Sequence, residues 1–301
     1  MRVSAIGIGC WQASTDWSST NDDNIIMALR RSYELGVNLI DTAEVYGNGH
    51  SETVVSRAVK EIGRENLIIA TKVAAPHLRY DEVQKACDAS INRLGVKEID
   101  LYQVHWPDPW EQVQLRHTMK ALEKLYIEGK IKAIGVSNFA VRDLEEARAH
   151  LSKTDIVANQ LRYNLLQREI EEEVLPYCRR NNIAILAWSP LGQGVLTGRY
   201  RHENKPRDVA RNGNRLFSAH NTENTEKLLV VLSEIGKRHG KTLAQVALNW
   251  LTRSPVVVPI PGATSQRQAE ENAGSVDWRL SDQELSEIER AYTGLRIEYY
   301  P

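Results

Sequence analysis

Four side chains that can take part in proton transfer stand at or just after the ends of short apolar runs. They occur in DTAEVYG, IIATK and LYQVHWPDP, and they are Asp41, Tyr46, Lys72 and His105. Reducing a carbonyl group with a hydride leaves an alkoxide, which must then receive a proton. A tyrosine, with an ordinary pKa of about 10, is too weak an acid for this step unless its surroundings help it. A proton-donating site is therefore the chemistry that these residue types suggest.

The same residues can assist one another. An ammonium group about 4 Å from a phenol favours the phenolate by several kcal/mol at low effective dielectric, and Lys72 can supply that charge. Asp41 can hold Lys72 in place and protonated, and His105 can hydrogen-bond the substrate oxygen. Taken singly, each has an ordinary structural interpretation: a turn cap, a packed ring, a lysine reaching toward water or a hydrogen-bonded histidine. Together, on three consecutive strands of one barrel, they predict a catalytic site with Tyr46 as general acid.

Short aliphatic runs alternate with longer amphipathic segments along nearly the whole chain. The predicted strands are Val3–Ile8, Leu39–Thr42, Leu67–Lys72, Ile99–His105, Ala133–Val136, Val157–Gln160, Ala184–Trp188 and Val256–Ile260. The predicted helices between them are Asp23–Leu35, Ser51–Ile62, Asp81–Leu94, Gln112–Glu128, Val141–His150, Glu169–Asn181, Thr222–His239 and Ser265–Ala273. Near-continuous apolar strands are typical of parallel strands buried on both faces. Eight such units favour a closed (β/α)8 barrel, whose functional residues lie at the carboxyl ends of the strands.

A doubly wound open sheet is the alternative architecture. It usually has fewer units and often carries a glycine-rich phosphate-binding turn after its first strand. Gly7 and Gly9 are not followed by a third glycine at the required spacing, so this fingerprint fails. We therefore expect one α/β domain over residues 1–301, a TIM barrel. A long loop without secondary structure is expected from Pro190 to Asn221, and an extra helix at Ser281–Tyr292.

The composition narrows the range of partners. Lys and Arg number 38 against 39 Asp and Glu, a net charge of −1 without a long basic run, so nothing points to nucleic acid or a membrane surface. The cysteines, Cys10, Cys87 and Cys178, are far apart and lack metal-ligand spacing, which is typical of free thiols in a reducing compartment. No apolar stretch approaches the roughly 20 residues of a membrane-spanning helix. We expect a cytoplasmic protein without a metal; its oligomeric state stays open.

The motifs DTAEVYGNGHSE, TKV, IDLYQVHWPDP and GVSNF occur in the order of the aldo-keto reductase family, which the chain resembles over nearly all of its length. The resemblance implies a (β/α)8 barrel whose catalytic tetrad is Asp41, Tyr46, Lys72 and His105. It also implies NADPH, less often NADH, bound in an extended pose across the barrel mouth without a glycine fingerprint. In its motifs the chain is nearest to the branch that contains potassium-channel β-subunits and bacterial and archaeal aldo/keto reductases.

Further site residues follow from the same resemblance. Ser137, Asn138 and Gln160 match the groups that hold the nicotinamide carboxamide, and Trp188 matches the aromatic ring that stacks on the nicotinamide. The full implied cofactor set is Gly9, Trp11, Asp41, Ser137, Asn138, Gln160, Trp188, Ser189, Pro190, Leu191, Gln193, Gly194, Leu196, Ala263, Thr264, Ser265, Gln268, Glu271 and Asn272. The implied substrate side, suited to a small carbonyl compound, is lined by Trp11, Tyr46, His105 and Trp106, with Trp110 as a further candidate.

Some positions depart from the family pattern. Strict NADPH enzymes often carry Lys and Arg where this chain has Gly262 and Gln268, so selection for the 2′-phosphate either rests on Arg267 or is weak. Because the first predicted strand starts almost at the first residue given, we expect no N-terminal hairpin of the kind that closes the barrel bottom in many relatives. The C-terminal tail GLRIEYYP is a candidate to cover that end or to close over the site, with a frayed terminus as the alternative.

Two other kinds of function stay open on the sequence. The channel β-subunit branch uses the same fold and cofactor site for partner binding and redox sensing, so a cofactor-binding regulatory protein is the alternative to an enzyme. A metal-dependent barrel hydrolase usually shows His-x-His after its first strand, and this chain has none. The sequence therefore predicts an NAD(P)H-dependent oxidoreductase that reduces aldehydes or ketones reversibly.

Overall fold

The computed structural model describes residues 1–14, 16–17, 21–110, 112–200 and 202–298. Its centre is an 8-stranded sheet in which neighbours in sequence are neighbours in space. Every described strand pair is parallel. The strands are β1 (Ile8–Gly9), β2 (Leu39–Asp41), β3 (Ile68–Val73), β4 (Leu101–Val104), β5 (Ile134–Ser137), β6 (Ile156–Arg162), β7 (Ala184–Trp188) and β8 (Val257–Pro259).

The first and last strands meet, so the sheet closes into a barrel. Gly7 N–H donates to the Pro259 carbonyl at 2.9 Å and Gly9 N–H to the Pro261 carbonyl at 3.1 Å, and Gly9 forms a parallel bridge with Gly262. A Cβ on Gly9 would lie 2.9 Å from the Ile260 carbonyl oxygen, so the seam needs glycine at this point. The predicted (β/α)8 fold class is confirmed.

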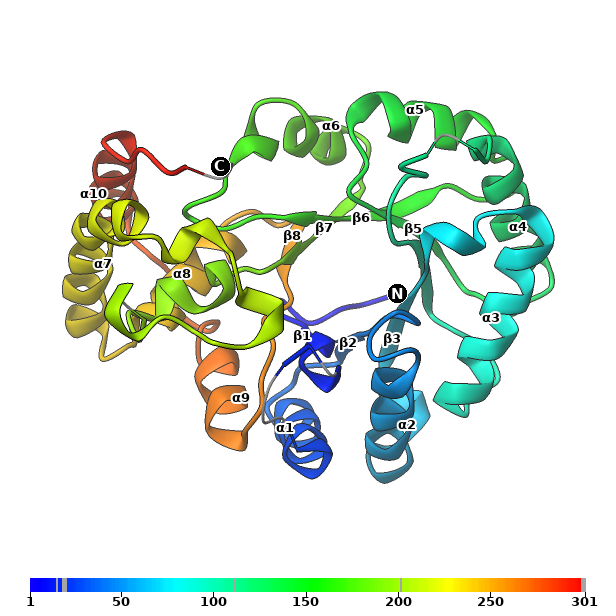
Figure 1. Cartoon of the computed structure of the whole chain (residues 1–301), viewed down its shortest axis with the longest axis horizontal. Helices are drawn as coiled ribbons and strands as arrows, with labels where there is room; N and C mark the ends of the chain where they lie inside the picture. The colour runs from blue at the N-terminus through cyan, green and yellow to red at the C-terminus, as the bar shows by residue number, and fades with distance from the viewer. Residues whose placement is uncertain (15, 18–20, 111, 201, 299–301) are drawn as a thin grey trace.

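Helices surround the strands on the outside of the barrel (Figure 1). They are α1 (Asp22–Glu34), α2 (His50–Ile62), α3 (Tyr80–Leu94), α4 (Leu115–Ile127), α5 (Val141–Ala149), α6 (Val174–Arg180), α7 (Ala219–His239), α8 (Leu243–Thr252), α9 (Gln266–Ala273) and α10 (Asp282–Thr293). Side chains fix several starts: Asn21 accepts from Asp23 N–H, and Ser281 with Glu284 forms a capping box at α10. In the part of the chain that the structure describes, no helix is long and apolar enough to cross a membrane.

The inward face of the strands changes from apolar to polar along their length. Leu39, Ala70, Leu101, Ala158 and Leu186 belong to one buried cluster inside the barrel. Side chains two residues apart on a strand point to the same side. The next inward positions are therefore those of Asp41, Lys72, Gln103, Gln160 and Trp188. Because side chains alternate between the two faces of each strand, the barrel interior has a polar layer at the carboxyl ends of the strands, next to the buried apolar cluster.

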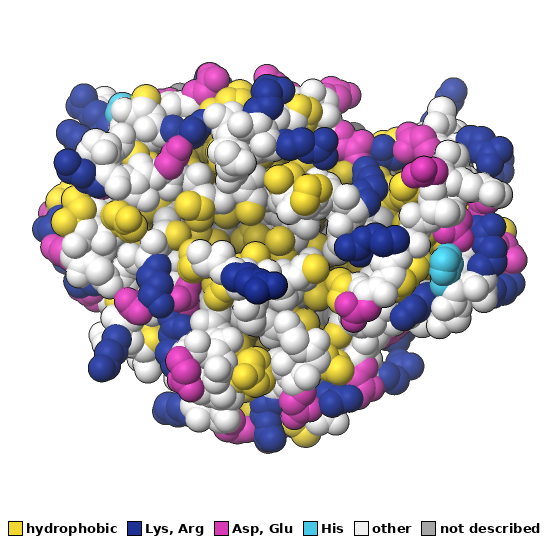
Figure 2. Space-filling view, turned by 180° about the vertical axis from the view of Figure 1, so that it is seen from behind, with side chains coloured by type: hydrophobic (Ala, Val, Ile, Leu, Met, Phe, Trp, Pro, Cys, Tyr) yellow, Lys and Arg dark blue, Asp and Glu magenta, His cyan; other side chains and the backbone are white. Residues whose placement is uncertain are grey.

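The N-terminal residues run across the middle of the ring of strands (Figure 1), where Ser4 N–H donates to Asn38 Oδ1 at 2.8 Å. Apolar side chains gather across the middle of the molecule in the view from behind (Figure 2).

The C-terminal tail was a candidate cover for the barrel bottom, but its described part docks elsewhere. Glu298 N–H donates to Asn221 Oδ1 at 2.9 Å, and the Asn221 amide donates back to the Glu298 carbonyl.

Several predicted elements differ from the structure. The first strand, predicted as Val3–Ile8, covers only Ile8–Gly9, because the chain before it is bonded to Asn38. The helix predicted as Glu169–Asn181 begins at Val174, since Pro176 is tolerated only in a first helical turn. Helix α8 was not predicted, although Thr242 and Gln245 form a capping box at its start.

The connection from Pro190 to Asn221 is also not a structureless loop. Its described residues contain the short 3-10 helices η5 (Gly192–Thr197), η6 (His202–Asn204), η7 (Val209–Arg211) and η8 (Arg215–Phe217), and α7 begins at Ala219. The side chains of Asp208, Asn214 and Ser218 cap the turns that follow them. Leu216 and Phe217 are buried, so this end of the connection packs into the hydrophobic core.

Candidate active site

The acid–base residues meet at the carboxyl ends of β2, β3 and β4. Lys72 Nζ lies 2.6 Å from Asp41 Oδ1, 2.8 Å from the Thr42 carbonyl oxygen and 3.4 Å from the Tyr46 hydroxyl. The side chains of Lys72 and Asp41 are 0% and 3% exposed, so this ion pair is buried. The rings of Tyr46 and His105 stand edge to face at a centroid distance of 5.7 Å. The structure therefore brings together all four residues that the sequence singled out.

Burial and charge set the protonation of these groups. Burial raises the pKa of Tyr46. The Lys72 ammonium lowers it by a smaller amount, so the net shift of the Tyr46 pKa is upward. Burial disfavours the charge on Lys72, but the charges and hydrogen bonds of Asp41 and Tyr46 together outweigh it, and the Lys72 pKa is raised. Burial and then the Lys72 charge lower the pKa of His105 to about 3. Near neutral pH the site thus holds a protonated tyrosine, a charged lysine and a neutral histidine.

Two glutamines anchor the carboxylate of the ion pair. Gln160 Nε2 donates to Asp41 Oδ2 at 2.7 Å, and Gln103 Nε2 donates to the same oxygen at 3.2 Å. With Lys72 on the other oxygen, both carboxylate oxygens of Asp41 are paired. Gln103 is fully buried and was not predicted as a site residue. Its place two residues after the inward Leu101 is the sequence signal that would have found it.

These groups open into a cavity of about 740 Å³ at the mouth of the barrel. The implied residues that line it are Gly9, Trp11, Asp41, Tyr46, His105, Trp106, Ser137, Asn138, Gln160, Trp188, Ser189, Pro190, Leu191, Gln193, Gly194, Thr264, Gln268, Glu271 and Asn272. Lys72 lies behind Tyr46 and does not reach the cavity. Leu196 and Ala263 are buried in the core, and Ser265 caps α9, its side chain accepting from Gln268 N–H. These last three do not line the cavity.

The residues implied to hold the nicotinamide are joined by hydrogen bonds. Asn138 Nδ2 donates to the His105 carbonyl at 3.1 Å and to Ser137 Oγ at 3.0 Å, and its Oδ1 accepts from Trp188 Nε1 at 3.2 Å. Ser137 Oγ donates to the Gln160 carbonyl at 2.9 Å. Asn138 therefore orients the Trp188 ring beside the acid–base groups, linking β4, β5, β6 and β7.

The backbone along one wall adopts unusual conformations. Asn138, Ser189 and Gln193 have positive φ angles of 63°, 48° and 53°, in the left-handed region that few non-glycine residues enter. Gly194, with φ of 108°, lies against the Tyr200 ring, which a Cβ there would meet at 2.8 Å. Such conformations persist where the surrounding structure enforces them, and they concentrate at ligand-binding sites.

A strap formed by the 190–217 connection crosses the cavity to the segment after β1. The Ala210 N–H donates to the Asp16 carbonyl at 3.0 Å. The Arg211 guanidinium lies 4.8 Å from the Trp17 ring centroid and 5.0 Å from that of Tyr200. It also pairs with Asp208 and donates to the Gln193 carbonyl at 3.4 Å. These contacts join segments nearly 200 residues apart, so no local motif predicts them.

Several other cavity-lining residues were missed by the sequence reasoning. They come mainly from the strap, from the segment after β1 and from the end of β8, and they are Gln12, Asp16, Trp17, Val45, Thr197, Arg199, Tyr200, Arg211, Ala244, Ile260 and Pro261. Gly262, which the sequence marked as a departure from the NADPH pattern, also lines the cavity. Arg267, weighed as a phosphate ligand, also lines the cavity and is exposed. Without a shared motif, such residues are identified only by their place in the fold.

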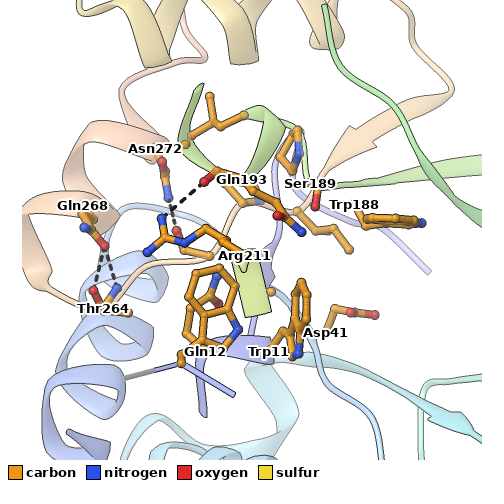
Figure 3. A pocket seen from close by; sticks show the side chains of 18 of the residues that line it. Trp11, Gln12, Asp41, Trp188, Ser189, Gln193, Arg211, Thr264, Gln268 and Asn272 are labelled. Atoms are coloured by element: carbon orange, nitrogen blue, oxygen red, sulfur yellow. Dashed lines mark hydrogen bonds between the residues drawn. The ribbon is translucent and has the colours of Figure 1, made fainter. Parts of the chain in front are cut away.

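The two ends of the cavity differ in chemistry (Figure 3). Trp188 and Asp41 lie toward one end, and Thr264, Gln268 and Asn272 lie toward the other. Gln268 Oε1 accepts from Thr264 N–H at 2.7 Å and from its hydroxyl at 3.1 Å. The cavity is therefore long enough to connect the acid–base groups with the first turn of α9.

The mouth beside Tyr46 is aromatic and exposed. Trp106 lines the cavity while 48% exposed, and Val45 is 45% exposed. Trp11 lies 6.4 Å from the Tyr46 ring between centroids. Trp110 does not line the cavity and is 61% exposed. Among the tail residues, Arg296 is exposed and not at the cavity, and Tyr299 and Tyr300 lie outside the described residues.

The chain matches the model of the aldo/keto reductase family over residues 5–293. It is 35% identical to an aldo-keto reductase from Bacillus subtilis, over 96% of this chain and 89% of that protein. It is 32% identical to a methylglyoxal reductase from Escherichia coli, over 97% of this chain and 92% of that protein.

Solved structures agree. An aldo-keto reductase from Klebsiella pneumoniae in complex with NADPH has a TM-score of 0.79 at 30% identity, covering 99% of this chain and 95% of that one. A glycerol dehydrogenase from Gluconobacter oxydans has a TM-score of 0.88 at 29% identity, with the same coverage of 99% and 95%. The chain therefore belongs to the aldo/keto reductase family, whose members are oxidoreductases that act on carbonyl compounds.

Proposed function

We propose that this protein reduces aldehydes or ketones to alcohols, reversibly, with NADPH as hydride donor and Tyr46 as general acid. The observation that carries the proposal is the buried Lys72–Asp41 ion pair directly behind the Tyr46 hydroxyl, at the end of a long cavity. Relatives crystallised with NADP and with NADPH support the choice of cofactor.

The cavity suits an extended dinucleotide. The acid–base groups and Trp188 occupy one end, and the other reaches the N-terminus of α9, where backbone N–H groups and the helix dipole favour a phosphate. Ser137, Asn138, Gln160 and Trp188 would hold the nicotinamide, and the Arg211 strap would cover the middle. When bound, the cofactor supplies a hydride.

The chain's own residues supply the proton and the orientation. The neutral His105 ring can donate a hydrogen bond to the substrate oxygen. No described side chain is hydrogen-bonded to this ring, since Asn138 bonds only the backbone carbonyl of His105. Tyr46 gives its hydroxyl proton to the oxygen that becomes the alcohol. The Lys72 ammonium stabilises the resulting phenolate, and Asp41, held by Gln103 and Gln160, keeps Lys72 charged and in position. In the reverse direction the phenolate accepts the alcohol proton.

The aromatic mouth suggests an apolar or aromatic carbonyl substrate. Trp11, Trp106 and Val45 surround the opening. Among the described cavity-lining residues, the charged group of the acid–base cluster is Asp41, whose carboxylate is already paired. No cation among the described cavity-lining residues contacts Tyr46, so uncharged aldehydes are the first compounds to test.

The test is a fluorescence titration with NADPH and NADH, followed by cofactor consumption against a panel of aldehydes. Tyr46→Phe removes one oxygen, so we expect NADPH binding within about twofold of wild type and a loss of turnover of at least 100-fold. A fully active Tyr46→Phe variant would overturn the proposed acid. Binding without turnover on a broad panel would favour the regulatory alternative instead.

A further inference from the structure

A side chain far from β8 in sequence occupies the space beside Gly262. A Cβ built on Gly262 would lie 2.1 Å from Nε2, 2.2 Å from Oε1 and 2.3 Å from Cδ of Gln12. The φ angle of Gly262 is not in the left-handed region, so its backbone does not demand glycine. The carboxamide of Gln12 lies over the Gly262 Cα, so a side chain at position 262 would force it to move.

The Gln12 carboxamide also carries an unused acceptor. Its Oε1 is buried and has no hydrogen-bond partner among the residues that the structure describes. Both Gln12 and Gly262 line the cavity, and the Gly262 carbonyl oxygen accepts from Asn272 Nδ2 at 3.2 Å. A buried acceptor without a donor is destabilising unless a ligand supplies the donor.

The charges around this point are balanced. Arg267 and Glu271 both line this end of the cavity, one cationic and one anionic. Gln268 has its oxygen committed to Thr264. The side-chain charges of Arg267 and Glu271 thus offset each other and do not by themselves favour a phosphate over a hydroxyl beside Gln12.

We propose that Gln12 is a cofactor-contacting residue whose carboxamide occupies the space that a side chain at position 262 would fill, and that it accepts a hydrogen bond from the 2′-hydroxyl of the adenosine ribose. This inference rests on the proposed function and extends it to nucleotide selection. The pyrophosphate bears no donor, so in the half of the cofactor away from the nicotinamide only the ribose hydroxyls and the adenine amine can satisfy Oε1. NADH has a 2′-hydroxyl where NADPH has an acceptor-only phosphate. The Gln12–Gly262 pair therefore lets this protein bind NADH about as tightly as NADPH.

The first experiment is a charge series at position 12, read as dissociation constants for NADH and NADPH in the intact protein. Gln12→Ala should weaken NADH roughly 3- to 10-fold, the effect of one lost hydrogen bond, and NADPH less. Gln12→Glu should weaken NADPH relative to NADH by about tenfold or more, and Gln12→Lys should shift the ratio the other way. Gln266→Lys and Gln266→Glu are the matched controls, because Gln266 is exposed at the start of α9 and does not line the cavity.

The second experiment tests the pairing of the two positions. Gly262→Ala should weaken NADH roughly 3- to 10-fold in the wild-type background, because the new methyl group displaces the Gln12 amide. In the Gln12→Ala background the same substitution should change NADH affinity less than twofold, since the space is already free. Thermal unfolding of each variant checks that the fold is retained.

The outcomes separate the two proposals. Binding of neither nucleotide by the wild-type protein would end the proposed function. The wild-type protein could bind both nucleotides while Gln12 variants change the ratio of the NADH and NADPH dissociation constants no more than Gln266 variants do. That result would overturn the role of Gln12 and leave the proposed function standing. A larger loss of NADPH than of NADH in Gln12→Ala would also overturn it, because the amide would then be donating to the phosphate. Independent effects of Gly262→Ala and Gln12→Ala would refute the pairing.

Discussion

Replacing Lys72 with methionine should destabilise the protein by about 3 to 5 kcal/mol, besides abolishing turnover. Methionine keeps the length of the side chain but removes three contacts, to Asp41 at 2.6 Å, to the Thr42 carbonyl at 2.8 Å and to the Tyr46 hydroxyl at 3.4 Å. Asp41 is 2% exposed and would be left as a buried carboxylate with only its two glutamine donors. The expected cost comes mostly from this stranded charge, and less from the lost attraction.

The double variant separates these contributions. Lys72→Met with Asp41→Asn leaves two neutral groups in the same space, so its loss of stability should fall well below the sum of the single losses. Its turnover should stay abolished, since the phenolate would have no cation beside it. Lys124→Met is the matched control: Lys124 is 45% exposed in a 3.7 Å pair with Glu128, and its loss should cost at most about 1 kcal/mol.

The assay is urea unfolding followed by far-ultraviolet circular dichroism, with the free energy of unfolding taken by linear extrapolation. A loss below about 1 kcal/mol for Lys72→Met would refute the argument that Asp41 is stranded. Additive losses in the double variant would show that the two residues act independently, contrary to their geometry. Recovery of turnover in the double variant would refute the electrostatic role of Lys72.

The folded protein lowers the pKa of His105 from 6.5 to about 3. As the pH falls, the His105 side chain therefore becomes protonated in the unfolded chain before it does so in the folded protein. The free energy of unfolding should therefore fall as the pH drops below about 6.5, with a loss of about 2 kcal/mol at about pH 5. In unfolding experiments at about pH 8 and about pH 5, His105→Gln should not show this pH-dependent loss. Trp188→Ala should weaken NADPH binding roughly 2- to 10-fold in fluorescence titrations, and unchanged affinity would remove the ring from the site. Asn221→Ala should cost about 1 to 3 kcal/mol and expose the tail to proteolysis, because Asn221 holds the Glu298 backbone in both directions. A tail as resistant as in wild type would contradict that clamp.

The sequence by itself determined the barrel and the residues of its acid–base cluster. Alternating strand and helix patterns are local properties, and eight parallel units bring their carboxyl ends to one face. Asp41, Lys72 and His105 stand at or near such ends, so their convergence follows from topology alone. Local capping chemistry would also have found α8, since Thr242 and Gln245 form a capping box shortly after Gly240 ends α7.

Only the tertiary structure decided how the cavity is closed and what balances its charges. The approach of Gln12 to Gly262 and the stacking of Arg211 on Trp17 join residues about 200 or more positions apart. Nothing in their local spacing encodes such contacts, because they depend on how the barrel seam and the strap pack. The protonation of Tyr46 is likewise a tertiary property, since burial by the whole fold outweighs the single nearby charge of Lys72.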